Sequence, residues 1–206
     1  MQLMRASWIV VFLGVLAWSG INPHDYPTWW LEVTPALVGA GILWFTRDRF
    51  PLTRMTYILI LAHCIILMVG GRYTYALVPV GNWVADIFDQ ARNNYDKLGH
   101  FAQGFVPAII ARELFIRLRV IVRSGWRDFL IVCLCLAVSA FYELIEWWVA
   151  LLSEEAAESF LGTQGYVWDT QSDMAWALFG SVVALVALGS WHDRQLRKAG
   201  YVPGAA

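Results

Sequence analysis

The chain has 206 residues, of which 59% are hydrophobic and only 15% are charged, and its mean hydropathy is +0.53. Soluble globular domains contain about 45–50% apolar and about 25% charged residues. The composition therefore excludes a disordered chain, a disulfide-rich secreted module and a nucleic-acid-binding protein, and it indicates a polytopic membrane protein in contact with membrane lipids. The formal net charge of −1 gives no indication of a polyanionic partner.

Six apolar segments approach the length of about 20 residues that a membrane helix needs. We expect one all-α transmembrane domain over residues 1–206, built as a bundle of six helices. The first segment resembles a signal peptide, but Trp18-Ser19-Gly20 is a poor cleavage site, so we expect it to remain as the first helix. The predicted spans are residues 7–21, 30–46, 55–70, 98–116, 128–152 and 172–191.

Basic residues are unequally divided between the two sets of span ends. Only Arg72, Arg92 and Lys97 fall on one side, and the other twelve of the fifteen fall on the opposite side. Because Lys and Arg accumulate in cytoplasmic loops, we expect both termini to face the cytoplasm. The Arg-rich stretch 112–127 is interpreted as setting this topology and touching anionic lipid headgroups. The twelve residues on the more basic side are Arg5, Arg47, Arg49, Arg54, Arg112, Arg117, Arg119, Arg123, Arg127, Arg194, Arg197 and Lys198.

Aromatic residues mark the expected membrane boundaries. Tryptophans near segment ends are interpreted as anchors at the headgroup level. In the long outer loop 72–96, apolar residues recur at helical spacing, which predicts an amphipathic helix in the outer interface. The anchoring set is Trp8, Trp29, Trp30, Trp44, Trp126, Trp147, Trp148, Trp168 and Trp191, and the amphipathic set is Trp83, Val84, Ile87, Phe88 and Ala91.

Three short segments carry most of the ionisable residues near the spans, where such groups are costly and therefore informative. They are 95–101, 142–147 and 168–173. Asp96 with His100, and Asp169 with Asp173, are separated by four residues, and Glu143 with Glu146 by three, so each pair shares a helix face. Span direction places all three segments in the outer half of the bilayer, where they are expected to form one polar site.

Several carboxylates in a poorly hydrated site cannot all remain charged without compensation. A divalent cation is one solution, with candidate ligands Asp96, His100, Glu143, Glu146, Asp169 and Asp173. Ion pairs with Lys97 and His100 are a second, and protonation in a proton relay is a third. The plainer alternative is that Asp96 and Asp169 are hydrated while Glu143 and Glu146 hydrogen-bond to neighbouring helices.

Other polar residues are expected to have structural roles. His63 is predicted to be a hydrogen-bonded core histidine, and His24 with Asp25 to belong to a turn. Gly104 with Pro107 predicts a bend that opens a cavity. Glu154, Glu155 and Glu158 are expected to be solvated, and Cys64, Cys133 and Cys135 to be unpaired thiols in lipid-facing or core positions.

The three polar segments together resemble the VanZ-like families of bacterial membrane proteins, and most closely their YjdF-like inner-membrane branch. Lys97, His100 and Phe101 match a Lys-x-x-His-Phe motif, Glu146 matches a Glu late in the next span, and Asp173 with Gly180 match an Asp followed by Gly. Ala177 replaces an Asn of the VanZ-like pattern, no Arg closely precedes Asp173, and the loop 153–168 is long, all of which favour the YjdF-like branch. The resemblance implies the bacterial cytoplasmic membrane and no settled reaction.

Three functions are compatible with these observations. The first is an enzyme that uses a divalent metal on a lipid or lipid-linked envelope molecule, with His100, Glu146 and Lys97 as candidate catalytic residues. The second is a proton-coupled transporter with Glu143 and Glu146 as protonation sites, which with six spans would favour a homo-oligomer. The third is a non-catalytic envelope protein in which the buried charges stabilise the bundle.

Overall fold

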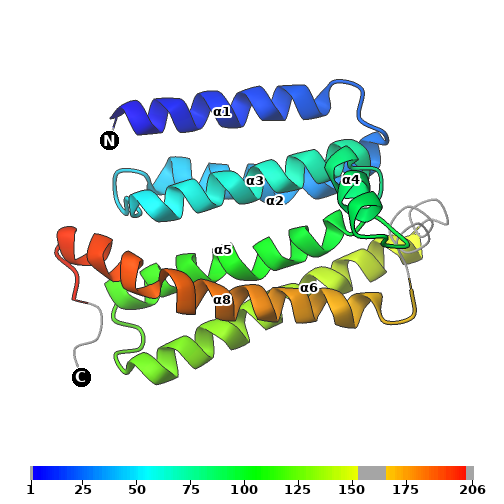
Figure 1. Cartoon of the computed structure of the whole chain (residues 1–206). Coiled ribbons are helices and arrows are strands. Elements are labelled where there is room, and N and C mark those ends of the chain that lie inside the picture. Colours follow the sequence, from blue (N-terminus) through cyan, green and yellow to red (C-terminus); the bar gives the residue numbers. More distant parts are fainter. Residues whose placement is uncertain (1, 153–165, 203–206) are drawn as a thin grey trace.

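The computed structural model describes residues 2–152 and 166–202, and within these ranges it is all-helical (Figure 1). The predicted solvation of Glu154, Glu155 and Glu158 lies outside the described residues. Five of the six expected spans lie within a helix, the first (7–21) ends one residue beyond α1, and most helices extend beyond the predicted bounds. The helices are α1 (Gln2–Gly20), α2 (Tyr26–Thr46), α3 (Arg54–Tyr73), α4 (Pro79–Ile87), α5 (Tyr95–Arg117), α6 (Ser124–Leu152) and α8 (Asp169–Lys198).

Within residues 2–152 and 166–202, four helices are long and apolar enough to cross a membrane by length and composition: α1, α3, α6 and α8. The other two long helices, α2 and α5, have 21 and 23 residues. Charged residues lower the hydropathy of α5, but Lys97, Arg112 and Glu113 are buried inside the protein. The exterior is correspondingly apolar, since Phe45, Leu152 and Val186 are each more than 80% exposed.

Local sequence signals set the helix boundaries. The Asp25 carboxylate accepts a hydrogen bond from the backbone N–H of Thr28 at 2.7 Å, which caps α2, as the predicted turn requires. The Thr53 hydroxyl caps α3 in the same way, and Thr74 ends that helix in the left-handed conformation. The predicted bend does not interrupt α5, which is continuous from Tyr95 to Arg117 with Pro107 inside it.

Helices α5 and α8 pack with their backbones in direct contact. A Cβ atom on Gly104 would lie 1.8 Å from the carbonyl oxygen of Ala177, and one on Gly180 would lie 2.2 Å from that of Phe101. Small residues allow this approach, as at many membrane-helix interfaces. The contact brings the first turns of α5 and α8 together and so positions the polar residues that they carry.

The N-terminal half packs around α3, with α1 and α2 against it. Val33 and Met68 are fully buried in this core. Trp29 is also buried, and its indole N–H donates to the Ser19 hydroxyl at 3.1 Å. The interpretation of Trp29 as an interfacial anchor is therefore wrong, because the indole finds its hydrogen-bond partner inside the protein.

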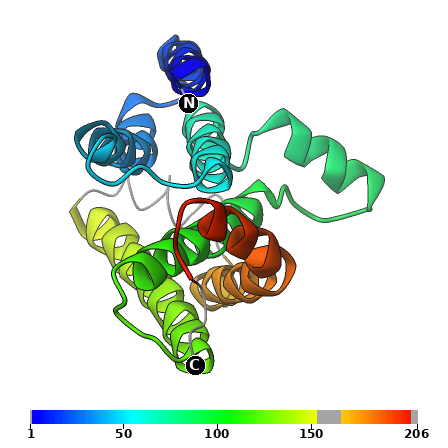
Figure 2. The same ribbon diagram turned by 90° about the vertical axis from the view of Figure 1, so that its left-hand side faces the viewer.

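The short helix α4 projects to the side of the bundle (Figure 2). Gly81 and Ala85 are buried, whereas Trp83, Ile87 and Phe88 are each more than 60% exposed. A helix therefore forms within the loop 72–96, but it ends at Ile87 and does not reach Ala91. Asp89 adopts a positive φ of 49°, which breaks the helical path.

Candidate functional site

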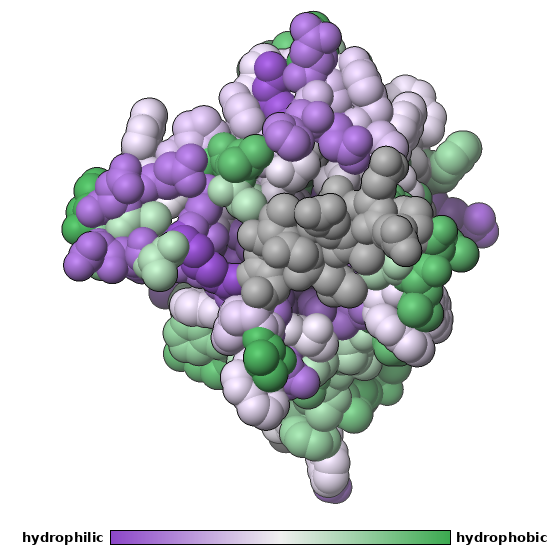
Figure 3. All heavy atoms as spheres, turned by 90° about the vertical axis from the view of Figure 1, so that its right-hand side faces the viewer, coloured by the Kyte–Doolittle hydropathy of each residue, from purple (hydrophilic) through white to green (hydrophobic). Residues whose placement is uncertain are grey.

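The three polar segments predicted from the sequence meet at one end of the bundle. The start of α5, the end of α6 and the start of α8 lie at the same end in Figure 1. Figure 3 views this end directly, where hydrophilic residues gather beside more hydrophobic patches. The expected convergence of these segments is confirmed.

Lys97 is the cation around which the aspartates are arranged. Its Nζ lies 2.5 Å from Oδ1 of Asp173 and 2.9 Å from Oδ1 of Asp169. It also lies 3.5 Å from Oδ2 of Asp96. Arg92 reaches the same oxygen of Asp169 through Nη2 at 3.0 Å. Asp169 is therefore neutralised by two cations, while Lys97 shares its charge among three carboxylates.

Each of the two ring nitrogens of His100 lies near at least one carboxylate. Its Nε2 is 3.3 Å from Oδ1 of Asp96 and 3.8 Å from Oδ2 of Asp173. On the other side, Nδ1 is 3.2 Å from Oε1 of Gln103 and 3.7 Å from Oε1 of Glu143. If Nδ1 donates to Gln103, the neutral ring presents its Nε2 lone pair to two carboxylate oxygens. A cation between them, or a proton on Nε2, removes the repulsion.

Asp96, His100 and Asp173 can each direct one ligand atom to a common point, since these atoms lie within 4.8 Å of one another. Two carboxylates and an imidazole are a donor set that suits Mn, Fe or Zn. Three protein ligands leave coordination positions open, as in catalytic metal sites. Glu143 faces the opposite nitrogen of His100, and Asp169 is bound to Lys97 and Arg92, so neither belongs to this group of three.

A cavity of about 210 Å³ adjoins this cluster. Asp96, His100, Asp169 and Asp173 form part of its wall, together with Glu146 of α6. Pro107 also lines it, whereas Gly104 packs against Ala177 of α8 and is not part of the wall. The polar cluster therefore has room beside it for a small ligand.

The cavity is also lined by Tyr142, from the predicted polar segment 142–147, and by three residues outside the predicted segments: Glu32, His63 and Tyr75. Glu32 is 5% exposed, and the Tyr142 hydroxyl donates to its Oε2 at 3.3 Å. Tyr75 interacts with the same carboxyl group; its burial and Glu32 hold the pKa of its hydroxyl well above the usual range, so it stays a donor.

Two of these residues, Glu32 and His63, stand out in the sequence as polar groups within predicted spans. Glu32 is the single acidic residue within the predicted span 30–46, and an intramembrane acid is by default a candidate functional group. His63 was expected to be a hydrogen-bonded core histidine. Its Nε2 is buried and has no hydrogen-bond partner among the described residues.

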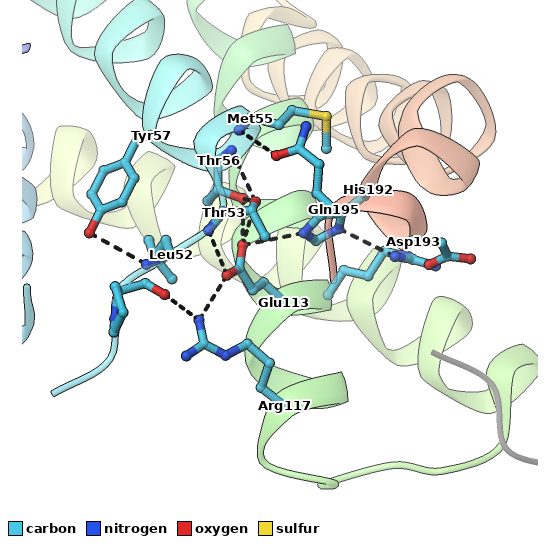
Figure 4. A network of polar contacts seen from close by, with 12 residues as sticks. Leu52, Thr53, Met55, Thr56, Tyr57, Glu113, Arg117, His192, Asp193 and Gln195 are labelled. Carbon is cyan, nitrogen blue, oxygen red and sulfur yellow. Dashed lines mark hydrogen bonds and ion pairs between the residues drawn. The ribbon is translucent and has the colours of Figure 1, made fainter. Parts of the chain in front are cut away.

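A second polar network lies at the other end of the bundle, where α3 begins and α5 and α8 end (Figure 4). The fully buried Glu113 accepts hydrogen bonds from the Thr53 N–H at 2.8 Å and from the Thr56 hydroxyl at 2.7 Å. Arg117 approaches Oε1 of Glu113 at 2.9 Å, and His192 Nε2 approaches Oε2 at 3.3 Å. This carboxylate thus connects three helices.

The same network corrects the interpretation of the Arg-rich stretch. Arg112 is 5% exposed and binds Asp193 at 2.6 Å, and Arg127 is 4% exposed. Arg117 also donates to the Pro51 carbonyl at 2.6 Å. Arg112, Arg117 and Arg127 therefore do not contact lipid headgroups, because their guanidinium groups are occupied or covered inside the protein.

Comparison with known proteins places the chain in a family of predicted membrane proteins. The family model described as "Predicted membrane protein (DUF2238)" matches residues 4–194. The inner membrane protein YjdF of Escherichia coli (strain K12) is 50% identical over 190 residues, which cover 92% of this chain and 91% of that protein. No solved structure gave a significant match.

Proposed function

Because the chain belongs to the DUF2238 family of predicted membrane proteins, we propose that it is a multi-pass protein of the bacterial inner membrane with a divalent-cation site at Asp96, His100 and Asp173. The proposed site acts on a lipid or lipid-linked envelope molecule. The observation that supports it best is the orientation of three ligand atoms toward one another at the edge of a cavity.

The neighbouring residues suggest a division of roles. Lys97 binds Oδ1 of Asp173 and Oδ2 of Asp96, so it positions both aspartates and leaves their other oxygens toward His100. Glu146 lines the cavity and is the proposed acid–base group. A bound divalent cation would activate water or polarise a phosphoryl oxygen. Glu143 would act on the orientation of His100 rather than as a ligand.

The proposed topology has six spans in one transmembrane domain, so α2 and α5 also cross the membrane. Arg5 contacts Asp48 at 3.1 Å, which brings the start of α1 and the α2–α3 loop to one end of the bundle. That end carries most of the basic residues, which supports cytoplasmic termini and a cation site in the outer half. The exposed apolar residues of α4 support a location in the outer interface.

The motif of Lys97, His100, Glu146 and Asp173 supports a wider relation to the VanZ-like families. A homo-oligomer remains part of the proposal because six spans are few for a transporter. Transport is the second candidate function, and it is favoured by the buried Oε1 of Glu143, which has no hydrogen-bond partner within the described part of the chain.

Metal analysis of the full-length protein, purified in detergent and in lipid, tests the cation site. We expect about one divalent ion per chain in the unmodified protein and in Glu113→Gln, whose change lies at the other end of the bundle. His100→Ala should lose the ion. Glu146→Ala should retain the ion but lose the proposed activity on a lipid or lipid-linked envelope molecule. Absence of a stoichiometric ion in both environments would overturn the site. Proton flux in liposomes that depends on Glu143 would favour transport.

A further inference from the structure

We propose that the cavity binds a primary ammonium group, such as the headgroup of an aminophospholipid, between Glu32 and Glu146. This inference rests on the proposed function, because it names the substrate class of the same site. Glu32 and Glu146 both line the cavity. They come from α2 and α6, whereas the proposed cation ligands come from α5 and α8.

The charge of the cavity wall favours a cationic ligand. Among the described residues that line it, five are acidic, two are histidines and none is Lys or Arg. Lys97 lies behind the aspartates and is bound to three of them. An anionic group entering alone would meet Glu32 and Glu146, which have no Lys or Arg partner among the described residues, whereas an ammonium group would be attracted to them. The five acidic residues are Glu32, Asp96, Glu146, Asp169 and Asp173.

The size of the cavity favours a headgroup over a larger molecule. Its volume is about 210 Å³, and sites for drug-sized ligands have about 300–1,000 Å³. A glycan or a whole lipid does not fit such a space, but an aminoethyl phosphate group does. In this arrangement the phosphate lies toward the proposed cation at Asp96, His100 and Asp173, and the ammonium lies toward Glu32.

The hydrogen-bonding groups on the wall match a primary ammonium group. Such a group has three N–H donors and no acceptor. Three groups are able to accept from it: the Glu32 carboxylate, the Glu146 carboxylate and the His63 Nε2, which has no hydrogen-bond partner among the described residues. Tyr142 donates to Glu32 at 3.3 Å and thereby orients the carboxylate. A quaternary trimethylammonium group lacks these donors and should bind more weakly.

Binding to the full-length protein in detergent distinguishes these ligands. The probes are dihexanoyl phosphatidylethanolamine, the corresponding phosphatidylcholine and phosphatidylglycerol, and free ethanolamine. We expect the ethanolamine lipid to bind at least about tenfold more tightly than the other two lipids. Glu32→Gln should lower its affinity at least about tenfold, and Tyr142→Phe, which keeps the carboxylate, should lower it less.

Two controls separate this inference from the proposed function. Glu113→Gln should bind the ethanolamine lipid like the unmodified protein, and His100→Ala should lose the metal but still discriminate between the three lipids. Free ethanolamine binding as tightly as the lipid would support the ammonium site and assign it to a soluble amine. Equal binding of phosphatidylglycerol, or unchanged affinity in folded Glu32→Gln, would overturn the inference.

Discussion

Asp96 and Asp173 each divide their two carboxylate oxygens between the same pair of neighbours. Oδ2 of Asp96 and Oδ1 of Asp173 face Lys97, and the remaining two oxygens face Nε2 of His100. Asp96 lies at the start of α5 and Asp173 at the start of α8, so the arrangement depends on the close packing of these helices. Lys97 thus fixes the geometry that the proposed cation site uses.

Replacing Lys97 should destabilise the bundle strongly. Lys97→Met leaves three neighbouring carboxylates without their shared cation, and removing one partner of a buried ion pair costs about 3–5 kcal/mol. Unfolding in mixed micelles measures this loss. Adding Asp173→Asn should recover part of the stability that Lys97→Met loses. A double variant whose loss of stability equals the sum of the two single losses would contradict the shared arrangement of Lys97 and Asp173.

Metal affinity should increase as the pH rises from 6 to 8. The proposed ligand is neutral His100, so at low pH protons compete with the metal, and binding releases protons. Calorimetric titration of Mn²⁺ at pH 8 and at pH 6 measures the difference. Affinity that is equal at both values, or that His100→Ala does not change, would argue against His100 as a ligand.

Replacing glycine by alanine should have opposite effects on stability at two positions of the α5–α8 pair, Gly104 and Gly189. Gly104→Ala places a Cβ 1.8 Å from the Ala177 carbonyl oxygen, so the helices must separate at a cost of about 1–3 kcal/mol. Gly189→Ala, on the same helix pair, meets no atom within 4 Å and should stabilise the protein by about 0.5–1 kcal/mol. Equal effects in thermal unfolding would contradict the described packing.

The Glu113 network should matter for stability and not for the ligand site. Glu113→Ala leaves Arg117 and the hydroxyls of Thr53 and Thr56 without their acceptor, at a cost above about 3 kcal/mol. The exposed Asp48, paired with Arg5, offers a matched control, and Asp48→Asn should change stability by less than about 1 kcal/mol. Comparable losses in the two variants would count against the buried network.

Much of the helical architecture followed from apolar runs of membrane length, and the convergence of Asp96, His100 and Asp173 followed from charged residues at the ends of those runs. Glu32 and His63 were missed as site residues, because the face that an apolar helix turns inward depends on packing between distant segments. Arg112 and Arg117 were assigned to lipid headgroups because their acceptors, Asp193 and Glu113, become neighbours only in the folded bundle.

Anomalous X-ray scattering from crystals of the full-length protein grown with Mn²⁺ tests the proposed cation site most directly. The account predicts one strong peak bounded by Oδ1 of Asp96, Nε2 of His100 and Oδ2 of Asp173, and its loss in the Asp96→Asn, Asp173→Asn double variant. No peak at this position in well-ordered crystals, or a peak that persists in the double variant, would contradict it.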